Sequence, residues 1–311
     1  MEFHLYPTGR QETNESLRLA CRYERQDASG HVVGAGESWY EFSEWPDGLA
    51  EDNAEPFLLN HLPFAMEEGR DLHLHGQVSL SLMRSLIEFR DYWVVVKPDR
   101  YKPVEIMVEK IVDDTSATAL PGAVCAFSGG ADAAYTAWRH AQGLVGAQTR
   151  DLRFGLFLDG LEHASLKNRD HYEKTYEICC QMMASLGLPL VRVRFNCHEV
   201  QLPEYRALFF GIYTASLASS LYLFSGQVGE GLLGSGYDYT HPRAAHDYSN
   251  PFCDRLLSSH SFRIRHDGAE TKRVAKLAAL AEWPEFCRTA RVCWHPLADG
   301  SNCGKCEKCL R

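Results

Sequence analysis

Short apolar segments alternate with amphipathic segments between residues 123 and 233, and this alternation restricts the chain to few folds. We expect buried strands at 123–127, 152–158, 190–195 and 228–233, separated by helices at about 132–142, 169–186 and 204–223. Strands that are separated by helices of this length form a parallel sheet between helices. The sequence therefore predicts an α/β fold for residues 116–311, with a parallel sheet and helices on both faces.

Residues 1–115 differ from this part in charge and in pattern. They contain 11 Lys and Arg against 22 Asp and Glu, whereas residues 116–311 contain 21 against 19. Helical spacing marks 80–90, and β-forming residues mark 17–23, 38–42, 71–78 and 92–97. We expect a separate acidic α+β domain at 1–115. It carries no chemical motif, which favours a role as a scaffold or in contact with a partner protein.

The overall composition excludes several classes of protein. No run of 18 uncharged apolar residues is present, so no membrane span is expected. The first residues lack the basic start and apolar core of a signal peptide, which favours a cytoplasmic location. The acidic half is a poor surface for nucleic acid, so we expect no extended nucleic-acid interface.

The first predicted strand of the α/β part ends in a turn that is typical of a phosphate-binding loop. Ser128, Gly129 and Gly130 follow the apolar run, and a helical pattern begins near Asp132. Glycines allow backbone N–H groups to approach an anion closely, and the start of a helix adds partial positive charge. We expect these four residues to bind the phosphates of a nucleotide. The alternative is an ordinary Ser–Gly turn that enters a helix.

Four cysteines near the end of the sequence have the spacing of a metal site. Nine residues separate Cys293 from Cys303, and two residues separate each further pair, Cys303 from Cys306 and Cys306 from Cys309. Clustered cysteines in a cytosolic chain indicate metal more often than disulfides. Four thiolates suit a closed, tetrahedral and structural Zn²⁺ site. An iron–sulfur cluster and four free thiols are the alternatives.

The loop and the cysteine cluster together resemble a known family. The loop is similar to the Ser-Gly-Gly-x-Asp-Ser loop of PP-loop ATP pyrophosphatases, with Ala133 in place of the second serine. Residues 122–311, about 60% of the chain, resemble the 7-cyano-7-deazaguanine synthases known as QueC, which end in a Cys-Gly-x-Cys-x-x-Cys zinc site. The acidic N-terminal domain is not part of the housekeeping synthase. QueC-like proteins with added N-terminal domains occur in bacterial anti-phage gene clusters, and the architecture resembles theirs.

This resemblance implies an enzyme that uses ATP to activate a carboxylate, as expected for a 7-deazaguanine substrate. Pyrophosphate and AMP leave, and ammonia or an amine captures the acyl group to give a nitrile, an amide or a conjugate. Ser128 and the two glycines would hold the pyrophosphate, and Asp132 would bind Mg²⁺. Backbone at Phe157 and Leu158 would frame the adenine.

The resemblance also implies a cation near the phosphates and carriers for protons. The catalytic candidates are Asp132, Lys272 and Arg243, with Lys167 as a further cation and with His241, His246 and Asp247 as proton carriers. Two other functions stay open. The chain could be a PP-loop ligase of another substrate class, or a non-catalytic nucleotide-binding module that docks a protein partner through its acidic domain. The family resemblance is compatible with a homodimer.

Overall fold

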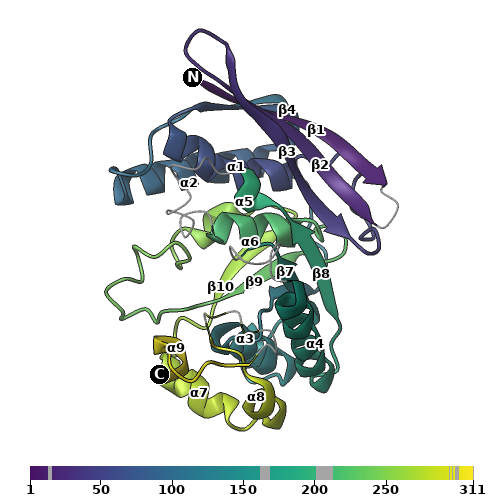
Figure 1. The fold of residues 1–311 in the computed structure, drawn as a ribbon, viewed down its shortest axis with the longest axis vertical. Helices are drawn as coiled ribbons and strands as arrows, with labels where there is room; N and C mark the ends of the chain where they lie inside the picture. Colours follow the sequence, from purple (N-terminus) through teal and green to yellow (C-terminus); the bar gives the residue numbers. More distant parts are fainter. Residues whose placement is uncertain are drawn as a thin grey trace.

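A single sheet organises the protein. The computed structural model describes residues 1–12, 16–161, 169–200, 213–293, 295, 297 and 301–310. Within these ranges ten strands form one sheet in the order β10-β9-β6-β7-β8-β3-β2-β1-β4-β5 (Figure 1). All neighbouring strands are parallel except in the three central pairs, β8–β3, β3–β2 and β2–β1. The predicted α/β class with a mostly parallel sheet is confirmed.

The parallel part near the C-terminus has a strand order that reverses beside its first strand. It consists of β6 (Ala123–Ala126), β7 (Leu152–Asp159), β8 (Leu190–Phe195), β9 (Glu230–Gly234) and β10 (Arg263–Asp267). The chain runs from β6 to β7 and β8 on one side, and then returns to place β9 and β10 on the other. Ligands of such sheets bind beyond the carboxyl ends of the strands at this reversal. A site is therefore expected where β6 and β9 end.

Helices cover both faces of this parallel part because its strands are apolar on both sides. Val124 and Leu156 belong to the cluster that contains α6, whereas Cys125 and Phe157 belong to the cluster on the other face. The helices are α6 (Tyr213–Tyr222) on the first face and α3 (Ala131–Ala141), α4 (Arg169–Ser185), α7 (Arg273–Leu280) and α8 (Pro284–Thr289) on the second. Part of the helix predicted at 204–223 lies outside the described residues.

The N-terminal half of the sheet has helices on one side. Its strands are β1 (Glu2–Glu12), β2 (Leu17–Gln26), β3 (Val32–Phe42), β4 (Asp71–Ser79) and β5 (Ile106–Val112). Figure 1 shows α1 (Glu55–Glu68) and α2 (Leu80–Val96) together on the same side of these strands. Along β4, Leu72 and Leu74 are buried toward the helices, whereas the alternate residues His73 and His75 are not. The opposite face of these strands is thus polar.

One predicted strand is wrong. Residues 92–97 carry β-forming side chains, but α2 continues through them to Val96. Trp93 lies four residues after Phe89 and extends the buried stripe of the helix, while Val95 points to solvent with 79% of its surface exposed. Packing against the core thus overrides local β-propensity here. The strands predicted at 17–23, 38–42 and 71–78 and the helix at 80–90 are confirmed.

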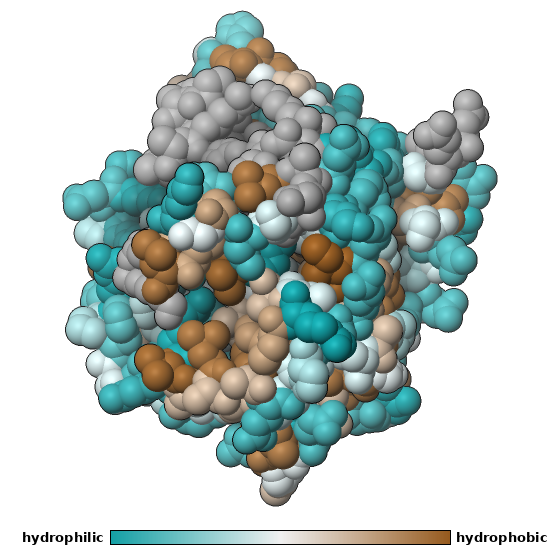
Figure 2. Space-filling view, turned by 60° about the horizontal axis from the view of Figure 1, so that its bottom comes forward, coloured by the Kyte–Doolittle hydropathy of each residue, from teal (hydrophilic) through white to brown (hydrophobic). Residues whose placement is uncertain are grey.

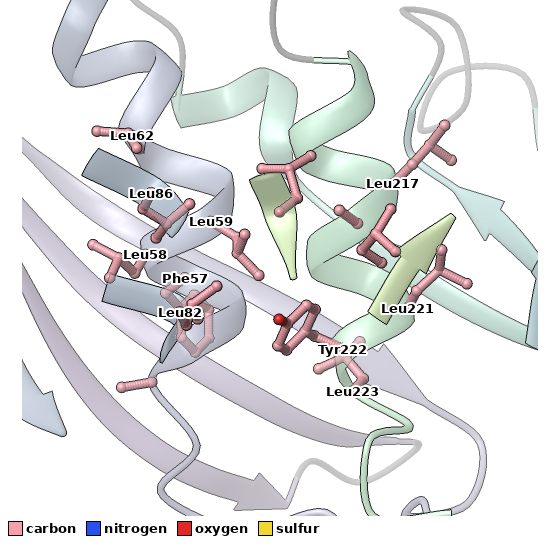
Figure 3. Close-up of a cluster of buried hydrophobic side chains, with 14 of the residues drawn as sticks. Phe57, Leu58, Leu59, Leu62, Leu82, Leu86, Leu217, Leu221, Tyr222 and Leu223 are labelled. Carbon is pink, nitrogen blue, oxygen red and sulfur yellow. The ribbon is translucent and has the colours of Figure 1, made fainter. Parts of the chain in front are cut away.

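The two halves of the sheet share a core. β3 pairs antiparallel with β8 at Tyr40 and Phe195, which joins the halves in one hydrogen-bonded sheet. The Tyr40 hydroxyl donates to Ser219 Oγ of α6 at 2.9 Å. Figure 3 shows Tyr222 of α6 pointing toward Phe57 of α1 and Leu82 of α2, and all three belong to one buried cluster. The predicted domain boundary between residues 115 and 116 falls between β5 and β6. Because the two halves share a core, this boundary stays a prediction.

No helix in the described part of the chain is both long enough and apolar enough to cross a membrane.

We predict that Leu221→Ala destabilises both halves at once. Leu221 is fully buried in the shared cluster, and removal of such a side chain costs about 2–5 kcal/mol. Denaturant unfolding, followed by tryptophan fluorescence and by circular dichroism, should shift to lower denaturant as one transition. Val95→Ala on exposed helix surface is the control and should change stability by less than about 0.5 kcal/mol. Two separate transitions, with only one of them shifted, would contradict a shared core.

We also predict that His61 makes the protein less stable in mild acid. His61 is fully buried in α1 among aromatic rings, its Nδ1 donates to the Phe57 carbonyl at 2.7 Å, and burial lowers its pKa to about 4. The unfolded chain binds this proton near pH 6.5, so stability falls as the pH decreases from 6.5 toward 4. Between pH 7 and 5 the loss is about 2 kcal/mol. In His61→Phe this pH dependence, measured by urea unfolding, should be weaker than in His31→Phe on the surface.

Candidate functional site

The glycine-rich turn lies at the strand-order reversal. It follows β6 directly, and Gly130 is the N-cap of α3, with φ −74° and ψ 159°. Ser128 is exposed, and Gly129 is buried. The turn therefore presents a hydroxyl and the start of an eleven-residue helix beyond the carboxyl end of the central strand. This is the arrangement in which a helix start binds anions.

Gly129 is required both by its conformation and by its surroundings. Its φ is +73°, in the left-handed region that favours glycine. A Cβ at this position would lie 3.1 Å from Cys179 Sγ of α4. The neighbouring strand approaches more closely still, because a Cβ on Gly234 at the end of β9 would lie 2.6 Å from the Asp132 carbonyl oxygen. The predicted glycine turn is thus held tightly between α4 and the end of β9.

Asp132, in the first turn of α3, is paired with cations that the sequence did not single out. Arg273 Nη1 donates to Asp132 Oδ2 at 2.6 Å, and Lys276 Nζ lies 3.7 Å from Oδ1. Lys276 is buried, which lowers its pKa, while the charge of Asp132 opposes that shift. Asp132 Oδ1 accepts no hydrogen bond from the described residues. One carboxylate oxygen thus retains coordination capacity for a metal ion beside two positive charges.

Arg291 is a third cation at the turn, and it comes from the segment before the cysteine cluster. Its backbone N–H donates to the Gly129 carbonyl at 3.2 Å. Its guanidinium donates through Nη2 to His171 Nε2 of α4 at 2.5 Å, and His171 Nδ1 donates to the Leu297 carbonyl. The buried Nε of Arg291 has no partner within the described ranges. Only the tertiary structure brings this arginine to the turn, since it lies 162 positions beyond Gly129.

The cations predicted from the sequence lie elsewhere. Lys272 is exposed and caps α7, one position before Arg273. Arg243 and His246 are exposed on an irregular segment after β9, where His241 stacks on Tyr237. Asp247 follows them, and burial raises its pKa. Lys167 lies outside the described residues.

Phe157 and Leu158 lie inside the paired part of β7 instead of beyond it. Phe157 packs in the core against Tyr176, and the strand continues to Asp159. Asp159 is fully buried and binds the guanidinium groups of Arg169, at 3.0 Å, and of Arg192. The backbone that leaves the sheet at this edge therefore begins at Gly160, two residues after the predicted position.

The four cysteines predicted as metal ligands converge on one point. The Sγ atoms of Cys293, Cys303, Cys306 and Cys309 all lie within 4.8 Å of one another. Three of the Sγ–Sγ separations are 3.4 Å (Cys306–Cys309), 3.8 Å (Cys293–Cys306) and 3.9 Å (Cys303–Cys309). Tetrahedral Zn²⁺ with bonds near 2.3 Å places its sulfur ligands about 3.8 Å apart. The cluster therefore fits a four-coordinate metal such as zinc.

Backbone groups around the cluster favour thiolates. Lys305 N–H and Cys306 N–H donate to Cys303 Sγ at 3.4 and 3.3 Å, and the first of these lowers the pKa of Cys303. Burial and the neighbouring thiol of Cys306 raise the pKa of Cys309 to about 12. Four thiolates so close together need a cation to coexist, which a bound metal ion supplies.

The cysteine cluster is physically continuous with the glycine turn. Asn302, next to Cys303, accepts from the N–H of Val292 and of Cys293 and donates to the Ala290 carbonyl at 2.7 Å. These bonds fix residues 290–293, of which Arg291 contacts Gly129. A metal held by the four cysteines therefore stabilises the position of Arg291.

The surface around this end of the molecule is mixed. Figure 2 brings forward the end that carries α7, α8 and α9 (Glu307–Leu310), and hydrophobic side chains there form several small groups between hydrophilic ones. Cavities of about 430 and 240 Å³ lie along β10, the first against α2 and the second near Tyr239. Neither cavity is lined by residues 128–132. The turn and its charges, and not cavity volume, identify this site.

Comparison with protein-family models, with curated proteins and with solved structures finds no match to this chain.

We predict that Cys306→Ser removes the metal and loosens the turn. Loss of one thiolate should reduce zinc content by about one ion per chain, as measured by mass spectrometry of the purified protein. Melting temperature should decrease, and hydrogen exchange at Gly129–Asp132 should increase because Arg291 is no longer held. Cys287→Ser on the exposed surface of α8 is the matched control and should keep the metal. Unchanged zinc content in Cys306→Ser would contradict the assignment.

Proposed function

We propose that this chain is an ATP-dependent enzyme of the PP-loop class that activates a carboxylate and joins it to ammonia or an amine. The observation that carries the proposal is the position of the glycine turn. It lies at the strand-order reversal of a parallel sheet, begins a helix, and is contacted by a segment that leads into a tetracysteine cluster. The same two motifs, in the same order, carry the resemblance to QueC.

The charges around the turn suit a triphosphate. Ser128 and the N–H groups at the start of α3 would bind the leaving pyrophosphate, and Arg291 would add positive charge beside them. Asp132 would hold Mg²⁺ through its free oxygen or keep Arg273 and Lys276 oriented toward the phosphates. Positive groups that are fixed in advance stabilise the charge that develops on a leaving group. Arg291, Arg273 and Lys276 replace Lys272 and Arg243 as the favoured cations.

The reaction class follows from these groups together with the resemblance. A carboxylate oxygen would be joined to AMP as pyrophosphate leaves, and the amine would then displace AMP. A 7-deazaguanine carboxylate is the favoured substrate class because it is the substrate of the family that the C-terminal part resembles. The acidic half would then supply contacts to a protein acceptor or partner.

Ala133 favours slower ATP turnover than in an enzyme that has the family serine at this position. It follows Asp132 on α3 and is half-buried against the neighbouring core. The family serine would place a hydroxyl here, and Ala133 offers the phosphates none. Loss of one neutral hydrogen bond costs about 1 kcal/mol, which slows a reaction without abolishing it. A nucleotide-binding module without turnover remains the second candidate.

We predict that the protein forms AMP and pyrophosphate from ATP when Mg²⁺, 7-carboxy-7-deazaguanine and ammonia are present. Arg291→Ala should reduce the rate about 10²–10³-fold, because it removes a charged donor at the leaving group. Arg288→Ala is the matched control and should retain full activity, because Arg288 is an exposed arginine of α8, three positions before Arg291. Rates are measured as AMP by chromatography.

The outcomes separate the candidates. AMP formation with other carboxylates only would favour a ligase of a different substrate class. ATP binding that Arg291→Ala weakens, without any AMP, would favour the binding module. Absence of both ATP binding and turnover in the zinc-loaded protein would overturn the proposal.

A further inference from the structure

A second group of potential metal ligands lies on the outward face of the N-terminal half of the sheet. Parallel pairing of β1 and β4 places His4 directly beside His73. Alternation along each strand brings Glu2 and His75 to the same face, because successive side chains point to opposite sides. Three imidazoles and a carboxylate therefore gather on two neighbouring strands, although they lie about 70 positions apart in the sequence.

The side chains converge in space as well as in register. Ligand atoms of Glu2, His4 and His73 all lie within 4.8 Å of one another. Glu2 Oε2 is 2.9 Å from His4 Nε2, and Glu2 Oε1 is 3.8 Å from His73 Nε2. The His4 and His73 rings stack with centroids 4.6 Å apart. Small side-chain rotations would bring all three atoms to bonding distance of one ion, which is about 2.1 Å for zinc.

Two details distinguish this group from an ordinary surface ion pair. His73 Nε2 is buried and has no hydrogen-bond partner among the described residues. The other nitrogen of His4, Nδ1, lies 3.1 Å from His75 Nε2. Ligand histidines in proteins commonly have their second nitrogen held in this way, which fixes the ring for coordination. The Nε2 atom of His73 is thus available to a metal ion, and the ring of His4 is held in one orientation.

We propose that Glu2, His4 and His73 bind one divalent transition-metal ion, with His75 as the positioning residue for His4. Two imidazoles and one carboxylate suit zinc and its neighbours in the first transition series. Such a site has three protein ligands and leaves a coordination position open to water or to an added ligand. It therefore differs from the cysteine cluster, which is closed by four thiolates.

Zinc content of the full-length, tag-free protein tests this proposal. The protein is saturated with ZnSO₄, freed of weakly bound metal by gel filtration, and measured by mass spectrometry beside the His73→Ala and Glu2→Gln variants. The unsubstituted protein should hold one zinc ion more per chain than His73→Ala, and Glu2→Gln should bind this ion at least tenfold more weakly. His31→Ala, a change at an 82%-exposed histidine of the β2–β3 hairpin, is the control and should keep both ions.

A second readout separates this site from the cysteines and from failure to fold. Co²⁺ bound by thiolates gives strong sulfur-to-metal absorption, whereas a nitrogen and oxygen site gives only weak visible bands. His73→Ala should lose the weak bands and keep the strong absorption, which also shows that the rest of the chain is folded. His75→Ala should shift the weak bands and lower affinity without removing the ion. Equal zinc content in the unsubstituted protein and His73→Ala would overturn the proposal.

Discussion

The reversal of strand order beside β6 is the constraint on which the candidate site depends. β6 is central in the parallel part, with β7 on one side and β9 on the other. Connections after β6 and β9 therefore leave the sheet in different directions and expose the ends of both strands. Glycine at the end of β9 allows this strand to approach α3 closely, since any side chain on Gly234 would collide with the backbone of α3. A ligand at this edge would therefore meet the N-terminal end of α3.

The acidic half of the chain is joined to this site through structure that it shares with the C-terminal half. Tyr40 of β3 stacks on Phe195 of β8 and hydrogen-bonds to α6, which packs under the parallel strands. Asn60 of α1 also accepts a buried hydrogen bond from the Ser216 hydroxyl of α6 at 2.8 Å. Buried polar contacts of this kind specify one relative placement of helices, because any other placement leaves the groups unsatisfied. The N-terminal half of the chain is thus part of the scaffold that supports the glycine turn.

The sequence predicted most of the parallel strands, the glycine turn and the four cysteines, because each depends on local pattern or spacing. It did not predict β1, β5 or β10, or the helical state of residues 92–96, where contacts across the fold decide. It also selected Lys272 from a family motif, although Arg273 is the residue that contacts Asp132. Lys272 is the N-cap of α7 and has extended backbone, whereas Arg273 begins the helix, and spacing alone does not locate this boundary. Arg291 could not be predicted, because its contact with Gly129 exists only after the chain has folded back.

That contact gives the cysteine cluster a role beyond holding the end of the fold. The backbone N–H of Arg291 donates to the Gly129 carbonyl, and those of Val292 and Cys293 donate to Asn302. A tetrahedral ion bound at the cysteines would remove the remaining freedom of residues 290–293 by fixing Cys293, two residues from Arg291. The guanidinium would then be held in place before an anion binds, and fixed charges act more strongly than charges that must reorganise. Metal binding at the cysteines and anion binding at the turn should accordingly be coupled, since each stabilises the same placement of Arg291.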